Sequence, residues 1–548
     1  MPPKRCPPPF LVIPEFCLSF QMEPTNTSKP AKSMIQPADA LRHPEAYPHP
    51  VQQEIAVVET HISWIFLTGQ FAYKMKKPVN LGFLDFSTLE QRKHFCEEEL
   101  RLNRRLCADL YLDVLPVTSS AEGIRIGGDG EAVDYVIRMA QFDRSFELDR
   151  LLRNGELTTR EIDEAASVIS AFHAETPRAD PASLFGTPGL ILKPMLENLD
   201  LTEEVARTIK ERSSIEKIRH WTLAEHRRLS GVVRERKALG MVRECHGDLH
   251  TGNMVMRDGK IAIFDCIEFS HALSIIDVMS DVAFLFMDLE HSGHPELAWH
   301  FLNAWLTKSG DYSGLQVLRL YCVYRAMVRA KVTSIRLAQE SGEEERAKTL
   351  AEHHSYLRLA LGYMQPRSPM LLITHGVSGS GKSVISARLA DLGGFIHIRS
   401  DVERKRLFGI DSLERSAAKG FDIYTPEATQ KTYDTMLAAA TTTLEAGFPV
   451  IVDATFPDNH HRLPFNRLAN TLNLPCRILC LHASREVLRE RVWTRHEAGS
   501  DASEADLRVL EAQLHASAPP DGDEKALCIN VNTEGEVHIE KLLAALDG

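Results

Sequence analysis

The sequence predicts an α+β domain followed by an α/β domain with a mostly parallel sheet. Three observations predict this order. Strand-like runs before residue 80 are followed by long helical stretches up to residue 362. From residue 370 onward, apolar strand-like runs alternate with helical runs, which is the pattern of a parallel sheet covered by helices. The chain of 548 residues also exceeds what one hydrophobic core usually supports, so at least two domains are expected.

The composition is that of a globular protein, with 44% hydrophobic and 25% charged residues. No apolar run approaches the roughly 18–20 residues that cross a bilayer, so the sequence predicts no membrane partner. The net charge of −12 argues against a general nucleic-acid binder, although the total would hide a local basic cleft. Ten scattered cysteines without a CxxC pair fit reduced thiols, so we expect a cytoplasmic protein. The sequence leaves the oligomeric state open.

The N-terminal segment, residues 1–50, is rich in proline and polar residues, and we expect it to be disordered. Pro14 and Glu15 interrupt its short apolar patch, which argues against a signal peptide. Met22 and Met34 are alternative start residues.

Residues 55–80 predict two strands, HISWIFL and FAYKMKK, at the start of the first domain. The run that follows begins with Ser87 and Glu90 at the spacing of a capping box and predicts a helix. Helical periodicity then dominates until it stops around GYMQPRSPM, where a new apolar strand begins. We therefore place the first domain at residues 51–362 and the second at residues 363–548.

A hairpin signal lies in the middle of the first domain, where Asp258-Gly259 separates the alternating runs NMVM and IAIF. Counting outward from this turn places Asn253 and Asp265 at the same end of the hairpin, and Asp248 lies on the loop before it. A carboxylate and an amide at a shared edge can hold Mg²⁺, and a second carboxylate can take the proton of an attacking hydroxyl. This layout suits phosphoryl transfer, which depends mainly on positioning and charge neutralisation. The alternative, polar turn residues without chemistry, applies to Asp258 and Gly259.

Two further residues complete this candidate site. In AYKMKK, Lys74 and Lys76 point to the same face of the predicted strand. Glu99 falls on the apolar stripe of the predicted helix, where a carboxylate is costly unless it is paired. A Lys74–Glu99 pair would remove that cost and hold the phosphates of a nucleotide, with Lys76 and Glu98 as alternatives.

HGDLHTGN, followed by IFDCIEF, resembles the catalytic and metal-binding loops of the aminoglycoside phosphotransferase family, a branch of the protein-kinase-like fold. AYK resembles the strand lysine motif of that superfamily. The resemblance implies a protein-kinase-like α+β fold over roughly residues 55–362, with ATP and Mg²⁺ as cofactors. The site residues that it implies are the catalytic base Asp248, the metal ligands Asn253 and Asp265, and the ATP anchors Lys74 and Glu99.

The sequence departs from the protein-kinase pattern at two points. Cys266-Ile267 stands where Phe-Gly follows the metal aspartate in protein kinases. No GxGxxG precedes Lys74, only the single Gly69. Both departures suit the small-molecule branch, so the implied partner is a small-molecule hydroxyl acceptor. The resemblance does not identify an antibiotic as that acceptor.

GVSGSGKS satisfies the P-loop pattern G-x-x-x-x-G-K-[ST] and stands between an apolar strand and a helical run, as the motif requires. Its glycines let backbone N–H groups surround a phosphate, Lys382 reaches the terminal phosphates and Ser383 contacts Mg²⁺. The ATP-binding residues expected here are Gly376, Ser378, Gly379, Ser380, Gly381, Lys382 and Ser383.

Two carboxylates end apolar strand-like runs in this second domain. Asp401 closes GFIHIRSD and Asp453 closes FPVIVDATF, and ligands gather at the carboxyl ends of strands in open α/β sheets. One would organise Mg²⁺ and water while the other activates an acceptor hydroxyl, and a helix N-cap is the alternative for each. Arg491 and Arg495 lie four residues apart and predict either a lid that neutralises phosphate or a solvated helix face.

RSDVERKRLFG, VIVDATF and RERVWTRHEAGSDASEADLRVLEAQ resemble the P-loop kinases of the polynucleotide-kinase and zeta-toxin type, over about residues 368–545. The two-domain order also resembles bacterial proteins that join an aminoglycoside phosphotransferase to an ATP-binding domain of the AAA family. The roles implied are acceptor base for Asp401, substrate or phosphate contact for Arg404, and lid arginine for Arg491 or Arg495. Asp453, at its strand end, is then the expected metal ligand.

The sequence therefore predicts a kinase with two Mg-ATP sites, which transfers phosphate to a hydroxyl of a sugar, an aminoglycoside-like compound or a nucleotide. In the alternative hypothesis, the N-terminal half is a non-catalytic nucleotide-binding module and the P-loop half is the active kinase. The missing glycine-rich loop favours this alternative. A polynucleotide 5′-kinase is a third hypothesis, against which the acidic total counts. The acceptor, and whether the two sites communicate, are open at the level of sequence.

Overall fold

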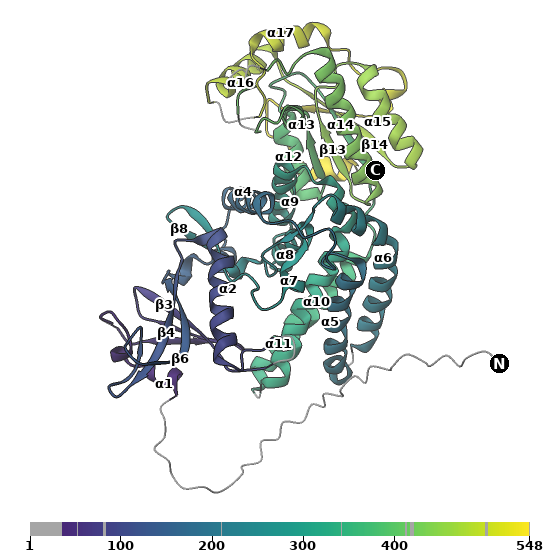
Figure 1. Cartoon of the computed structure of the whole chain (residues 1–548). Coiled ribbons are helices and arrows are strands. Elements are labelled where there is room, and N and C mark those ends of the chain that lie inside the picture. The colour runs from purple at the N-terminus through teal and green to yellow at the C-terminus, as the bar shows by residue number, and fades with distance from the viewer. Residues whose placement is uncertain are drawn as a thin grey trace, which may run out of the picture.

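The computed structural model (Figure 1) describes residues 36–51, 53–80, 84–209, 211–340, 342–411, 414–416, 421–498 and 502–546. A region built from the earlier residues, purple to teal in Figure 1, adjoins a second region built from the later residues, green to yellow. The first region joins an antiparallel sheet to helices, and the second contains a parallel sheet. The predicted order of the two fold classes is confirmed. Most of the segment predicted to be disordered, with Met22 and Met34, lies outside the described residues.

Residues 36–50 differ from the prediction of a disordered segment. They form the short helices α1 (Pro37–Ala40) and η1 (Pro44–Ala46). Leu41 and Tyr47 are buried against one face of the first sheet, and the Tyr47 hydroxyl donates to Leu41 O at 2.5 Å. Composition does not predict this packing, because two apolar side chains, Leu41 and Tyr47, are enough to hold a short polar segment against a sheet.

A six-stranded antiparallel sheet forms the first part of the N-terminal region, in the order β1-β2-β3-β6-β4-β5. The predicted strands are β2 and β3, and the other four extend the sheet on both sides of them. In β3 the alternation of FAYKMK buries Tyr73 and Met75 on one face, where they join Leu41 and Tyr47, and leaves Lys74 and Lys76 on the other. The strands are β1 (Ala56–Glu59), β2 (Ser63–Leu67), β3 (Phe71–Lys76), β4 (Tyr111–Ser120), β5 (Gly123–Ile126) and β6 (Glu131–Ala140).

Helix α2 (Leu89–Cys107) packs on the sheet face that carries the two lysines. It begins one residue later than the sequence predicts. Thr88, not Ser87, is the N-cap, and it forms a capping box with Gln91 rather than Glu90. The two pairs have the same spacing and the same chemical types, so the pattern fixes the helix start only to within one residue. Glu99 lies on the buried side of this helix.

Helices form the remainder of the N-terminal region, with α8 and α10 at its centre. No helix in the described ranges is long and apolar enough to cross a membrane. Two small antiparallel pairs, β7 with β10 and β8 with β9, carry the loops discussed below. The helices are α3 (Leu148–Arg153), α4 (Thr159–Glu175), α5 (Pro188–Ile209), α6 (Arg212–Ala238), α7 (His271–Ser274), α8 (Val278–His291), α9 (Pro295–Ser309), α10 (Leu315–Gln339) and α11 (Glu343–Met364). The short elements are η2 (Arg144–Phe146), β7 (Val242–Glu244), η3 (Thr251–Asn253), β8 (Met254–Arg257), β9 (Lys260–Ile263), β10 (Ile275–Asp277) and η4 (Tyr312–Gly314).

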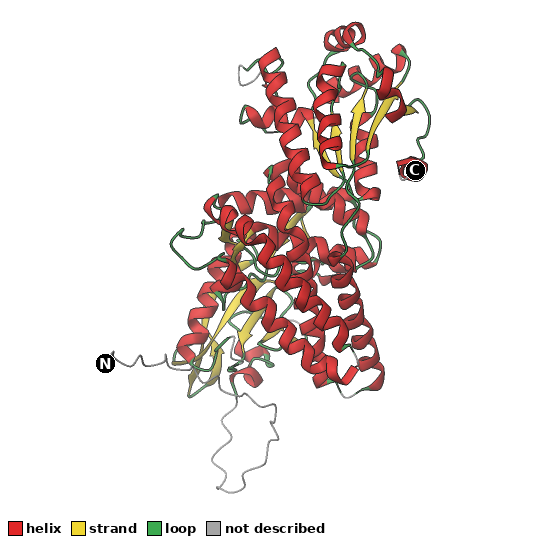
Figure 2. Cartoon of the chain, turned by 90° about the vertical axis from the view of Figure 1, so that its right-hand side faces the viewer, coloured by secondary structure: helices red, strands yellow, loops and turns green. Residues whose placement is uncertain are grey.

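The C-terminal region contains a five-stranded parallel sheet in the order β12-β13-β11-β14-β15. Figure 2 shows this sheet, at the top of the view, with helices on both sides. β11 is buried throughout, as expected for the central strand of a covered parallel sheet. The strands are β11 (Leu371–His375), β12 (Ile396–Arg399), β13 (Val450–Asp453), β14 (Cys476–His482) and β15 (Cys528–Asn532). The helices are α12 (Lys382–Gly393), α13 (Ser400–Leu407), α14 (Pro426–Glu445), α15 (Asn459–Leu472), α16 (Arg485–Ala498), α17 (Leu507–Ala516), η6 (Gly522–Leu527) and α18 (Ile539–Leu546).

The two regions share one hydrophobic core at the helix α9. Trp299 and Trp305 of α9 belong to the same buried cluster as Phe448 and the inner residues of β11 to β13. Asn303 extends the edge strand β12, because its Nδ2 donates to Phe395 O at 2.9 Å and its Oδ1 accepts from His397 N–H at 2.8 Å. The domains are therefore joined by packing and by hydrogen bonds from the Asn303 side chain to the strand backbone, and not by their linker alone.

His300, also on α9, forms an ion-pair bridge between the two regions. Its Nε2 lies 3.1 Å from Asp163 of α4, and its Nδ1 lies 3.0 Å from Asp391 of α12. Burial disfavours the imidazolium, but the two carboxylates outweigh burial and raise the pKa of His300 from 6.5 to about 9. This bridge should stabilise the fold fully below pH 6.5, and the stabilisation should disappear as the pH rises through about 9.

We expect His300→Gln to lower the free energy of unfolding at pH 6 by on the order of 2 kcal/mol, and by much less at pH 9.5. Thermal unfolding of both proteins at the two pH values measures this difference. His220→Gln, at an exposed position on α6, is the control and should leave the pH dependence unchanged. An equal effect of His300→Gln at both pH values would contradict a charged bridge.

Candidate active sites

The hairpin of β8 and β9 carries the first candidate site. Its two turn residues, Asp258 and Gly259, both have positive φ, as a two-residue hairpin turn requires. The strands pair in the predicted register, and Phe264 N–H donates to Asn253 O at 3.0 Å. Asn253 and Asp265 therefore stand at the same end of the hairpin.

Asp248 joins these two residues at the hairpin end. Asn253 Nδ2 donates to Asp248 O at 3.0 Å and to Asp248 Oδ2 at 3.3 Å. Asp265 has a φ of +67°, in the left-handed region that non-glycine residues seldom adopt. Its side chain is 44% exposed and accepts from Lys74 Nζ at 2.5 Å. The structure thus brings together four of the five residues that the sequence assigns to this site, and the fifth, Glu99, is described below.

The loop that carries Asp248 is held by Asp281, which lies outside the recognised motifs. The Asp281 carboxylate accepts from the N–H groups of His246 at 2.8 Å and Gly247 at 2.9 Å. Burial lowers the pKa of His246, so its ring is neutral: Nε2 donates to Phe264 O at 2.8 Å and Nδ1 accepts from Asp248 N–H at 3.2 Å. Both residues position the loop. Asp281 stands out in the sequence as a carboxylate inside the apolar run VMSDVAFLFMD.

Asp248 is ionised at neutral pH. Burial alone would raise its pKa, but His250, whose Nε2 lies 3.4 Å from Asp248 Oδ2, and Arg329 outweigh burial and hold the pKa well below the usual range. The same contact raises the pKa of His250 against the effect of its burial. An ionised carboxylate at this position can accept a hydrogen bond from a substrate hydroxyl and orient its oxygen. Neither His250 nor Arg329 was assigned a role from the sequence.

Lys74 and Lys76 share the carboxylate of Glu99. Lys74 Nζ lies 2.7 Å from Glu99 Oε1, and Lys76 Nζ lies 2.7 Å from Glu99 Oε2. Lys76 also pairs with Glu268, so its charge is neutralised by protein groups alone. Burial would raise the pKa of Glu99, yet the two ammonium groups lower it to about 2. The alternative acid, Glu98, lies at the surface side of α2 and pairs with Arg101.

Asn253 and Asp265 fit Mg²⁺ as oxygen donors. Asn253 donates to Asp248 through Nδ2, which leaves its side-chain oxygen, Oδ1, for another partner. Asp265 binds Lys74 through Oδ1, which leaves Oδ2 of this half-exposed side chain for another partner. Mg²⁺ is typically bound by one or two carboxylates together with substrate phosphates, and these two side chains match that donor set.

The second candidate site is the loop between β11 and α12. Gly376, Gly379 and Gly381 have φ values of +152°, +83° and +83°. Residues with a side chain adopt such values only with steric strain. A Cβ at Gly376 would also meet the backbone oxygen of Leu481 at 2.5 Å. Lys382 Nζ donates to the loop's own Val377 O at 2.9 Å. These glycines allow the backbone to curl around a phosphate-sized space at the start of α12.

Gln513 of α17 supports this loop from outside. Its side-chain oxygen accepts from Ser378 N–H at 2.7 Å. Ser380 and Ser383 lie on the same turn, where the hydroxyl of Ser380 is buried without a partner among the described residues. Gln513 carries no signal in the sequence, because a single polar residue on an amphipathic helix does not reveal a contact made across 135 positions.

The two carboxylates of the second site lie beside Lys382. Asp453 ends β13, and His397 of the neighbouring strand lies 3.2 Å from it. Burial would raise the pKa of Asp453, but His397 and Lys382 lower it to about 2. Asp401 lies in the first turn of α13. Burial lowers the pKa of Lys382, and the charges of Asp453 and Asp401 oppose this effect. Both predicted carboxylates therefore interact with the P-loop lysine.

The three arginines of the second site differ in their surroundings. Arg491 donates to Gly379 O at 3.3 Å and to Thr533 O at 2.6 Å, so it lies against the P-loop. Arg495 donates to Ala505 O at 3.3 Å, which ties α16 to the segment after it. Arg404 is buried, and its Nη1 binds Ile423 O at 2.9 Å and Thr429 Oγ1 at 3.1 Å. Arg404 thus holds the segment before α14 in this conformation.

Comparisons with known proteins agree with this division of the chain. A family model described as the phosphotransferase enzyme family matches residues 137–321, and a model described as an AAA domain matches residues 371–520. The first match includes Asp248, Asn253 and Asp265, and the second includes the P-loop.

Proteins similar to this chain occur in Mycobacterium. Uncharacterized proteins of Mycobacterium tuberculosis (strain H37Rv) and Mycobacterium bovis (strain AF2122/97) are each 30% identical over 473 residues, which is 85% of this chain and 91% of each relative. Among solved structures, a choline kinase from Cryptosporidium parvum covers 58% of this chain and 93% of its own, with 13% identity and a TM-score of 0.38. A gluconokinase from Sinorhizobium meliloti covers 33% of this chain and 90% of its own, with 21% identity and a TM-score of 0.24.

Proposed function

The chain belongs to the family of its Mycobacterium relatives and is a kinase that joins a phosphotransferase-family domain to a P-loop AAA domain, and from this premise we propose two Mg-ATP sites that each transfer phosphate to a small-molecule hydroxyl. The observation that carries the proposal is the convergence of Asp248, Asn253 and Asp265 on Lys74 in one domain, beside a complete P-loop in the other. The domain limits 51–362 and 363–548 are part of the proposal.

In the N-terminal site, Lys74 binds the nucleotide phosphates and Glu99 fixes its position. This assignment follows from position, because Lys74 lies between Glu99, which anchors it, and the half-exposed Asp265, the proposed Mg²⁺ ligand. Asn253 and Asp265 would hold Mg²⁺, which neutralises the developing charge on the phosphates. Asp248 accepts the hydrogen bond of the acceptor hydroxyl and takes its proton during transfer.

In the C-terminal site, the loop from Gly376 to Ser383 binds the phosphates, and Lys382 exchanges its bond to Val377 O for a phosphate oxygen. Ser383 and Asp453 would hold Mg²⁺, and Asp401 activates the acceptor. Arg491, which touches the loop, stabilises the transferring phosphate. Arg495 binds a backbone oxygen through Nη2 and Arg404 through Nη1, and the other N–H groups of each guanidinium are the donors that we assign to a phosphate or substrate.

The regulatory alternative concerns the N-terminal half. The turn between β1 and β2, residues 60–62, contains no glycine, and the turn between β2 and β3 contains one glycine, Gly69. The N–H of Gly69 donates to Gln141 at 2.8 Å, which supports a structural role for this turn. A site with weak phosphate cover can bind nucleotide without turning it over. The completeness of the Asp248, Asn253 and Asp265 set favours catalysis instead.

The acceptor belongs to the class of small hydroxyl compounds, and the cytoplasm is the proposed compartment, supported by eight free cysteines among the described residues. We expect labelled γ-phosphate to move from ATP to a sugar, amino alcohol or nucleoside in a metabolite pool, detected by chromatography and mass spectrometry. A single-stranded oligonucleotide with a free 5′-hydroxyl is the comparison acceptor. Transfer to the oligonucleotide alone would overturn the small-molecule proposal in favour of a polynucleotide kinase.

A further inference from the structure

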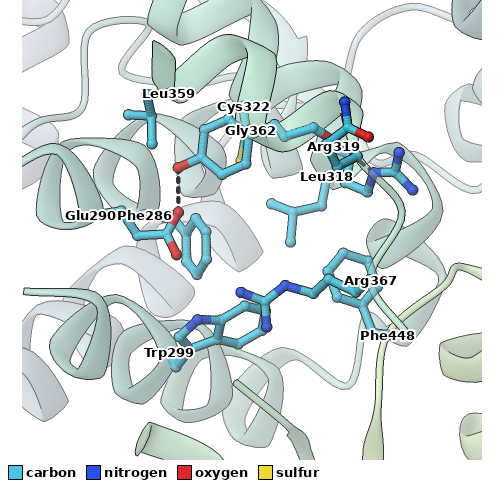
Figure 3. Close-up of a pocket in the computed structure, with 12 residues that line it drawn as sticks. Phe286, Glu290, Trp299, Leu318, Arg319, Cys322, Leu359, Gly362, Arg367 and Phe448 are labelled. Carbon is cyan, nitrogen blue, oxygen red and sulfur yellow. Dashed lines mark hydrogen bonds between the residues drawn. The ribbon is translucent and has the colours of Figure 1, made fainter. Parts of the chain in front are cut away.

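A cavity of about 210 Å³ lies where the two domains and their linker meet (Figure 3). Helices α8 to α11 form most of its wall, Arg367 of the linker crosses it, and Phe448 of the C-terminal domain closes one side. None of the described residues that line it belongs to either candidate ATP site. The cavity is therefore a third concave site, and its wall is formed by both domains.

The charged groups of the cavity are unequal in number. Arg319 and Arg367 line the cavity together with one acid. Glu225, outside the lining, compensates Arg319 in part, and the acid that acts on Arg367 is Glu290. That acid is already bound, since the Tyr363 hydroxyl donates to Glu290 Oε2 at 2.5 Å. Burial lowers the pKa of both arginines, as expected for guanidinium groups whose charge is incompletely compensated. An anion that entered the cavity would restore the balance.

The two arginines differ in what they can offer an anion. Arg319 donates to the carbonyl oxygens of Tyr363 and Met364, which anchors it to the end of α11. The guanidinium of Arg367 lies over Trp299, with its centre 4.3 Å from the ring centroid, and binds Gly394 O through Nη1 at 3.3 Å. Figure 3 shows the Arg367 guanidinium beside Trp299, with Glu290 near both of them. Arg367 is thus the donor best placed for a ligand.

The rest of the lining is apolar and aromatic, with Phe286, Leu318, Leu359 and Phe448 around the charged groups. Pockets for drug-sized ligands and nucleotides measure roughly 300–1,000 Å³, so this cavity is too small for ATP. A cavity of about 150 Å³ lined by apolar side chains holds one benzene ring. The volume here matches one ring with one small substituent.

We propose that this cavity binds a single-ring aromatic monoanion, with its carboxylate on Arg367 and its ring among Phe286, Leu318 and Phe448. Such a ligand contacts both domains and the linker at once, so its binding stabilises their packing. The proposal concerns a site separate from phosphoryl transfer and does not depend on the function of either ATP site.

Benzoate is the probe for this site, and benzyl alcohol, which keeps the ring and lacks the charge, is its matched control. With the full-length protein, we expect benzoate to bind with a Kd of about 1 mM or tighter by calorimetry or ligand-observed NMR, and benzyl alcohol to bind at least roughly tenfold more weakly. Saturating ATP should leave benzoate binding unchanged. Displacement of benzoate by ATP, or equal binding of the two probes, would overturn the proposal.

Two substitutions test the location. Arg367→Gln removes the charge and should weaken benzoate at least roughly tenfold. Gly362 lies on the cavity wall at an exposed position, and a Cβ there meets nothing within 4 Å, so Gly362→Phe adds a ring at the rim of the cavity without a clash and should also weaken binding. Gly231→Phe, at a helical glycine with equally open space on α6, is the control and should bind benzoate normally. Normal binding by Arg367→Gln, or no binding by the unsubstituted protein at about 10 mM benzoate, refutes the site.

Discussion

Replacing Lys382 with alanine is expected to lower kcat at the P-loop site by at least roughly 10²–10³-fold, because it removes the positive charge that stabilises the transferring phosphate. The ammonium group binds only a neutral carbonyl, Val377 O, among the hydrogen bonds of this structure. A phosphate oxygen is a stronger acceptor than a carbonyl and can replace it. The buried Asp453 keeps its direct partner His397 in the variant, so the variant should fold normally.

ATP turnover of four proteins measures this effect: the unsubstituted chain, Lys382→Ala, Asp248→Asn and the double variant. Two active sites predict that each single variant keeps the activity of the other site and that only the double variant is inactive. Lys431→Ala, at an exposed lysine on α14, controls for the loss of a lysine from the same domain. If Lys382→Ala alone abolishes all turnover and Asp248→Asn keeps all of it, the proposal of two active sites is wrong and the regulatory alternative stands.

The parts of the site that the sequence predicts are those governed by short-range rules. A two-residue turn fixes the hairpin register, so Asn253 and Asp265 could be placed together from Asp258-Gly259 alone. The period of a strand placed Lys74 and Lys76 on one face. The same period could not choose between them, and the structure shows why: Glu99 binds both lysines, one with each carboxylate oxygen.

The parts that the sequence does not predict depend on contacts between distant segments. Asp281 supports the loop of Asp248 from 34 and 35 positions away, and Gln513 supports the P-loop from 135 positions away. No periodicity or motif links such residues, because their contacts exist only after the helices have packed. For Arg404, the family resemblance implies a contact with a ligand. The structure shows contacts within the protein that the resemblance did not imply, from its guanidinium to Ile423 O and to Thr429.

Sequence patterns also do not predict the contacts between the two domains. These contacts extend to the strand that carries His397, beside Asp453 of the second site. Asn303 of the N-terminal domain pairs with the backbone of β12 on both sides of residue 396. The ring of His397, on the same strand, contacts Asp453, whose charge acts on Lys382. A displacement of α9 would therefore shift the strand that positions His397. Packing across the joint and the geometry of the P-loop site are parts of one continuous structure.

Asp248→Asn is expected to lower phosphoryl transfer at the N-terminal site by roughly 10²–10⁴-fold, the usual contribution of a positioned general base. The amide has nearly the same shape as the carboxylate, and the bond from Asn253 Nδ2 to Asp248 O involves the backbone, so the loop should keep its conformation. The pKa of Asp248 lies below the usual range, so the carboxylate is ionised throughout pH 5–8. Its titration should therefore produce no fall in rate over that interval.

The measurement is single-site turnover in a Lys382→Ala background, so that the P-loop site does not contribute. Asp258→Asn provides the matched control, because Asp258 lies in the turn of the same hairpin with φ of +49°, a conformation that asparagine also adopts. It should retain full activity. A rate loss of similar size in both variants would mean that the hairpin was disturbed as a whole, and a normal rate in Asp248→Asn would remove Asp248 from the chemistry. Loss confined to Asp248→Asn, with unchanged thermal stability, is the result that a proton-accepting carboxylate requires.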